Sequence, residues 1–128
     1  MRRLKELRKR LAGKIVTYYY GKQFDKAVEK ADKRHKAGEG KIYVVEHFEK
    51  GKLLSTIDRA QFRLIKHAAH KLHKNKAFYS HEYGVKMLTQ QCWYYTADKS
   101  EMGAISEQQK TIRRAAFIRS GLKKARLL

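Results

Sequence analysis

The sequence contains no proline and only one cysteine, Cys92, in 128 residues. A single thiol excludes an intrachain disulfide and any zinc site built from several cysteines. Without proline, helices lack the residue that most strongly breaks them, so the eight glycines are expected to end or bend them. No run approaches about 18 apolar residues, so we expect no membrane span.

Motifs of several enzyme classes are also missing. The phosphate-binding and dinucleotide-binding glycine patterns and the G-x-S-x-G turn of serine hydrolases do not occur. No secretory signal is expected, because Lys14 interrupts any apolar core near the N-terminus and no small-residue cleavage site follows. The sequence therefore suggests neither a reaction nor a cofactor.

Basic residues dominate what is present. Thirty-one Lys and Arg outweigh 12 Asp and Glu, which gives a net charge of +19. Residues 1–14 carry +6, residues 58–80 carry +5 and residues 110–128 carry +7, whereas residues 81–109 carry −2. A hydrophobic content of 42% is too high for a wholly disordered basic tail. The charge is thus concentrated in three segments of a chain that folds.

Hydrophobic periodicity predicts how these segments are organised. Residues 1–37 form a helical segment, either one long helix or two with a bend near Gly21. It carries an apolar stripe at helical spacing: Leu4, Leu7, Leu11, Ile15 and Tyr18. Residues 41–57, rich in β-branched and aromatic side chains around a glycine turn, predict a β-hairpin.

Two further helices are marked by capping residues. Asp58 and Gln61 begin a basic amphipathic helix over residues 58–74, and Ser106 and Gln109 begin a basic helix over residues 106–126. The apolar stripe of the second is expected to be Ile112, Ala115, Ile118, Leu122 and Ala125, with fraying at Gly121.

Residues 76–99 fit either a helix or short strands, and we favour a helix that carries Tyr83, Leu88, Cys92 and Tyr95. The predicted fold is therefore a single domain over residues 1–128. It is α+β and helix-dominated, with one β-hairpin and basic N- and C-terminal helices.

So high a charge in a short chain predicts contact with nucleic acid, DNA or RNA, or with another polyanion, through phosphates. The candidate contacts lie on three helix faces: Arg2, Arg3, Arg8, Lys9 and Arg10; Arg59, Arg63, Lys66, His70 and Lys74; and Arg113, Arg114, Arg119, Lys123 and Lys124. Aromatic residues such as Tyr18 and Trp93 offer stacking platforms if exposed, although most rings are expected in the core.

Two alternatives remain open. The chain fits a structural or assembly component of a virion or ribonucleoprotein complex, whose basic ends dock against other proteins. It also fits a metal-dependent nuclease that uses His47, His67, His70 or His73. Because no matching cysteine and few acidic residues accompany these histidines, we predict no metal site and no catalytic residue.

Residues 31–35, 41–45, 51–53 and 58–66 carry a resemblance. This stretch resembles small basic proteins encoded by phages and mobile elements of gut Bacteroidota, which have a helix, a hairpin and a helix opened by an Arg-x-x-Phe pattern, here Arg59 to Phe62. The resemblance implies a phage or mobile-element origin, hence a location in the host cytoplasm or within a virion. It implies no function and transfers no site residue.

Overall fold

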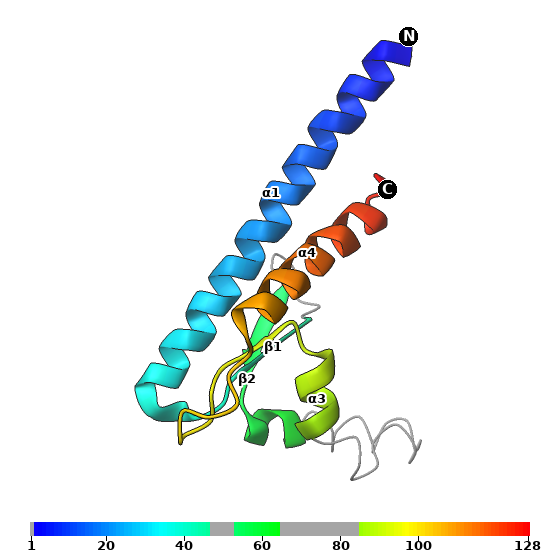
Figure 1. The fold of residues 1–128 in the computed structure, drawn as a ribbon. Helices are drawn as coiled ribbons and strands as arrows, with labels where there is room; N and C mark the ends of the chain where they lie inside the picture. Colours follow the sequence, from blue (N-terminus) through cyan, green and yellow to red (C-terminus); the bar gives the residue numbers. More distant parts are fainter. Residues whose placement is uncertain (1, 47–52, 65–84) are drawn as a thin grey trace, which may run out of the picture.

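The computed structural model describes residues 2–46, 53–64 and 85–128 (Figure 1). Its elements in chain order are α1 (Arg2–Arg34), the short π-helical turn η1 (His35–Glu39), β1 (Tyr43–Glu46), β2 (Leu54–Ile57), α3 (Val85–Gln91), β3 (Tyr94–Tyr95) and α4 (Glu107–Lys124). Residues 59–64 are also helical. The predicted helix-dominated α+β fold is confirmed.

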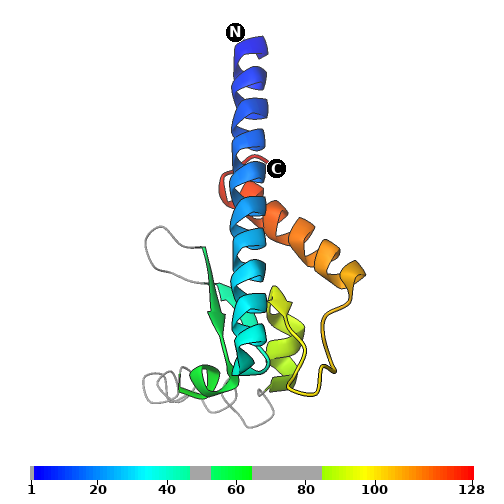
Figure 2. The same cartoon turned by 90° about the vertical axis from the view of Figure 1, so that its left-hand side faces the viewer.

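The N-terminal helical segment is one continuous helix, α1, without a bend at Gly21. It ends at Arg34 and runs on into η1, where Gly38 breaks the helical conformation with a φ of 89° that glycine adopts at little cost. Its buried residues, Gly21, Phe24, Val28 and Ala31, all lie in its second half. The first half of α1 extends past the C-terminal end of α4 (Figures 1 and 2).

The helix α4 packs along α1 with a face that only partly matches the predicted one. Phe117 and Gly121 are its buried residues, whereas Ile112 is 51% exposed and Ala115 and Ala125 are also exposed. The predicted stripe was right only in part: Ile118 and Leu122 are half-buried and Ile118 lies against Gly21 of α1, but the buried face is centred on Phe117 and Gly121. The pattern missed this centre because a glycine gives no hydrophobic signal. The prediction of fraying at Gly121 was wrong, since α4 continues to Lys124.

The sheet has the order β2-β1-β3, with both pairs antiparallel. The predicted hairpin is confirmed on its two strands, where Val44 pairs with Thr56; its turn, residues 47–52, lies outside the described residues. Helix was the right prediction for residues 85–91 and the wrong one for 94–95. Tyr94 pairs with Val44, so a partner distant in sequence determines the conformation of β3.

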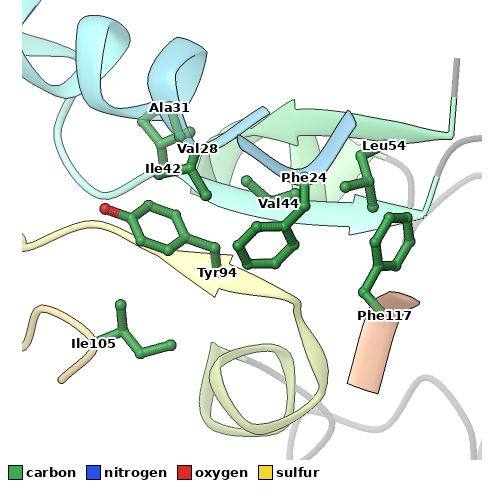
Figure 3. Close-up of a cluster of buried hydrophobic side chains, with 9 residues drawn as sticks. All are labelled: Phe24, Val28, Ala31, Ile42, Val44, Leu54, Tyr94, Ile105 and Phe117. Atoms are coloured by element: carbon green, nitrogen blue, oxygen red, sulfur yellow. The ribbon is translucent and has the colours of Figure 1, made fainter. Parts of the chain in front are cut away.

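Alternation along β1 divides the core between the two faces of the sheet. On one face, the side chains of Phe24, Val44, Tyr94 and Phe117 meet in a cluster formed with α1 and α4 (Figure 3). On the other face, the cluster is Tyr43, Ile57, Leu88 and Cys92. The sheet thus lies between the α1 and α4 pair and the shorter helix α3.

Both predicted helix starts are capped. Gln61 N donates to Asp58 Oδ1 at 2.7 Å, and Asp58 N donates to Gln61 Oε1 at 2.9 Å, which is a reciprocal capping box. Gln109 N donates to Ser106 Oγ at 3.1 Å. The described part of the first helix ends at residue 64, so the remainder of the predicted 58–74 helix lies outside the described residues.

Candidate polyanion-binding surface

Two of the three predicted basic faces come together at one end of the molecule. The C-terminal part of α4 lies beside α1 near the N-terminal half of that helix, and both termini are at this end (Figure 1). We call the exposed basic residues here the basic end: Arg2, Arg3, Lys5, Arg8, Lys9, Arg10, Lys14, Arg119, Lys123, Lys124 and Arg126. Glu6 is the acidic residue among them.

A groove of about 930 Å³ runs between the two helices at the basic end. Lys9, Arg10 and Lys14 line it from α1 together with the acidic Glu6, and Leu122 and Leu127 line it from the C-terminal side. Side chains of α1, including these three cations, form one wall of the groove, and apolar residues form the other. The groove is open to solvent. A phosphate chain placed along it would meet several cations from one helix.

The cations of the basic end make no ion pair with a carboxylate in residues 2–46, 53–64 or 85–128. Several carboxylates elsewhere in the described chain are engaged with other groups. Asp25 pairs with Arg114 at 2.9 Å, and Glu101 contacts His35 at 3.2 Å. Arg34 contacts both Glu39 at 3.0 Å and Asp58 at 3.6 Å. These carboxylates therefore do not neutralise the basic end, which keeps its positive potential.

Arg113 and Arg114, two predicted contacts on α4, are used inside the molecule. Arg113 Nη1 donates to the carbonyl oxygen of Cys92 at 2.8 Å and to that of Thr89 at 3.2 Å, which ties α4 to the end of α3. Arg114 makes a two-point contact with Asp25 of α1, at 2.9 and 3.0 Å. This hydrogen-bonded pair raises the pKa of Arg114 above its ordinary value. Both guanidinium groups serve to join elements of the fold.

The third predicted face lies apart from the other two. Arg59 and Arg63 are exposed on the helix of residues 59–64, at the opposite end of α1 from the N-terminus (Figure 2). Arg59 lines a cleft of about 490 Å³ with Lys41 and Asp98, where burial lowers the pKa of Lys41. The other predicted members, Lys66, His70 and Lys74, lie outside the described residues.

The nuclease alternative depends on side chains that could hold a metal ion. Among the described residues, no group of three or more His, Cys, Asp or Glu side chains is arranged to hold a metal ion. His47, His67, His70 and His73 lie outside the described part of the chain. Cys92 is 4% exposed and burial raises the pKa of its thiol, so it is a packed structural residue.

The aromatic residues divide between core and surface. Trp93 packs against Phe117 with ring centroids 5.1 Å apart, and the hydroxyl of Tyr94 donates to Asp32 Oδ1 at 2.7 Å. Tyr18 and Tyr19 are 67% and 43% exposed on α1, and Tyr18 also lines the groove. A core role is confirmed for Trp93 and Tyr94, while Tyr18 and Tyr19 lie on the surface of α1.

Comparison with known protein families, with curated proteins and with solved structures gives no match. None of the helices in the described part of the chain combines the length and apolar character needed to cross a membrane. The function therefore has to be argued from the surface itself.

Proposed function

We propose that the protein binds nucleic acid without catalysing a reaction, and that it does so through the phosphates at its basic end. One observation carries the proposal: Lys9, Arg10 and Lys14 of α1 line a groove, and α4, more than 100 residues later in the sequence, brings further exposed cations to the same end of the molecule. None of these cations makes an ion pair with a carboxylate of the described residues. Cations that only keep a chain in solution have no reason to gather in this way. The phosphate backbone is the ligand whose spacing of charge fits a row of Lys and Arg along a helix.

Its mechanism is counterion release. Each cation that neutralises a phosphate displaces condensed salt ions, so the logarithm of the binding constant falls by about 0.9 for each tenfold rise in salt and each contact. Lys9 and Lys14 on α1 and Lys124 on α4 are exposed and make no ion pair with a described carboxylate, so they can change without damage to the core. Contacts of this kind carry no base sequence information.

The test compares two triple variants of equal charge. The first variant alters the basic end and combines Lys9→Gln, Lys14→Gln and Lys124→Gln. The second alters exposed lysines outside the basic end and combines Lys26→Gln, Lys30→Gln and Lys36→Gln. Binding to a duplex DNA and to an RNA is measured across a salt series. We expect the first variant to lose about 2 to 3 units of salt slope and the second to lose much less.

Equal losses in both variants would contradict a localised surface, because binding would then follow net charge alone. Weak binding of the wild-type chain at low salt would remove the nucleic-acid proposal altogether. The second candidate function, assembly with other proteins, is favoured by an observation on α1 that is separate from its charge.

A further inference from the structure

The first half of α1 exposes an apolar stripe that the fold does not use. Leu4, Leu7, Leu11, Ile15 and Tyr18, here called the seam, are 54–67% exposed. Gly21, Phe24, Val28 and Ala31, which pack into the core, lie on another side of the same helix, about 120° away at 100° per residue. The seam is therefore not an extension of the core-facing side of α1.

The spacing of the seam is close to that of a coiled coil. Its five members are separated by three, four, four and three residues, a mean of 3.5, and they span about 21 Å of helix. Leu4, Leu7, Leu11 and Tyr18 hold contact-line positions of one heptad register, in which Lys14 takes the remaining contact-line position and Ile15 the flanking position after it. Leu4, Leu11 and Tyr18 occupy every seventh position. A stripe this narrow matches the contact line between two helices, whereas a helix lying in a lipid surface presents a broader apolar face.

Charges beside the seam define the partner. In the heptad register set by Leu4 and Leu11, the two flanking positions next to the contact line hold Arg3, Arg8 and Arg10. Flanking positions pair across a coiled coil, so a second copy of this chain would place arginine beside arginine in a parallel pair and in an antiparallel one. A helix with glutamate at the corresponding positions would meet all three arginines with opposite charge.

We propose that the seam is the docking site for an acidic amphipathic helix of another protein, held by leucine-type packing along the seam and by carboxylates beside Arg3, Arg8 and Arg10. This goes beyond phosphate binding, because the seam supplies register and apolar contact that nucleic acid does not use. It makes the first half of α1 an assembly element that binds a partner while the core remains in place.

The test uses the full chain and a synthetic peptide of three heptads, with Leu and Ile on its contact line and Glu at its flanking positions. A second peptide has the same composition in an order that destroys the heptad. Fluorescence anisotropy measures both. We expect the heptad peptide to bind at least about tenfold more tightly than the reordered one, a difference due to buried apolar contacts.

The double variant Leu7→Asn, Leu11→Asn should lose that tenfold advantage. The matched control is Ile112→Asn, which alters a residue 51% exposed on α4 and away from the seam, and it should bind the heptad peptide as the wild type does. Both variants alter exposed residues, and circular dichroism establishes that each is folded. The seam variant should keep its affinity for DNA and RNA, which separates this inference from the phosphate proposal.

Three results would overturn the inference. Equal binding of the two peptides would show attraction by charge alone. Sedimentation that finds a wild-type dimer, broken by the seam variant, would make a second copy the occupant. Binding to anionic phospholipid vesicles that depends on Leu7 and Leu11, with no preference for the heptad peptide, would make the seam a lipid contact.

Discussion

Gly121 of α4 lies so close to Tyr20 of α1 that a Cβ atom built on it would be 2.5 Å from the tyrosine ring carbons Cδ2 and Cε2. The ring of Tyr20 is itself held against Phe117, with centroids 5.1 Å apart. Gly13, in the exposed half of α1, would meet nothing within 4 Å. The same residue type therefore enables close helix packing at one position and has no packing role at the other.

Alanine substitutions at these two glycines should act in opposite directions. Gly121→Ala should lower the free energy of unfolding by about 1 to 3 kcal/mol, because Tyr20 must move within a packed cluster. Gly13→Ala should raise it by about 0.5 to 1 kcal/mol through helix propensity. Equilibrium unfolding in urea measures both, and stabilisation by Gly121→Ala would contradict the close approach.

The hydroxyl of Tyr94 should contribute to stability through Asp32. Its hydrogen bond to Asp32 Oδ1 is 2.7 Å long and partly buried, and burial raises the pKa of Tyr94. Tyr94→Phe should therefore cost about 1.5 to 3 kcal/mol, the range for hydrogen bonds to charged groups. The control is Tyr18→Phe, whose hydroxyl accepts from exposed Lys22, and it should change stability by less than about 0.5 kcal/mol.

Stability should decline as pH rises through the titration of His35. Its Nδ1 contacts the carbonyl oxygen of Gly40 at 2.8 Å and its Nε2 contacts Glu101 at 3.2 Å, and these contacts raise its pKa above the ordinary value of 6.5. A raised folded pKa gives stabilisation that is complete below 6.5 and is lost as pH rises through the folded value.

Nuclear magnetic resonance titration of the His35 ring, in the wild type and in Glu101→Gln, checks this assignment. The variant should titrate at lower pH than the wild type and still above 6.5, because the contact with Gly40 remains and is the larger cause. Urea unfolding midpoints measured over the same pH range should fall with rising pH. A pKa of His35 below 6.5 in the wild type would contradict this prediction.

The thiol of Cys92 should be protected from reagents in the folded protein. It is 4% exposed, and burial raises its pKa, so little thiolate is available. A disulfide reagent such as Ellman's reagent should react slowly in buffer and at once in denaturant. A Lys36→Cys variant, which adds a thiol at an exposed position, should show one fast thiol and one slow one. Two fast thiols in that variant would argue against burial.

Local signals predicted the parts of the fold that local interactions determine. The capping box of Asp58 and Gln61, the cap at Ser106 and the strands around Val44 were all read from neighbouring residues. The strand Tyr94–Tyr95 was not, because its conformation depends on pairing with β1, about 50 residues earlier.

The candidate surface was predicted less completely. Composition and charge segments identified its cations, and helical periodicity identified the seam, but no sequence pattern revealed that the C-terminal part of α4 lies beside the N-terminal half of α1. The sequence also did not reveal that Arg113 hydrogen-bonds to Cys92 and Arg114 to Asp25, because the pattern places both arginines on a basic helix face. Tertiary packing decided which cations face solvent.

The packing of Phe24 against Phe117, with ring centroids 6.1 Å apart, sets the order in which the chain can complete its fold. The two residues are 93 positions apart, so the core-facing side of α1 has no α4 to cover it until α4 itself has been synthesised. A nascent chain that ends before Glu107 lacks the ring that packs on Phe24. Exposed apolar surface of this kind is prone to aggregation and proteolysis, so the time needed to add α4 sets how long the risk lasts.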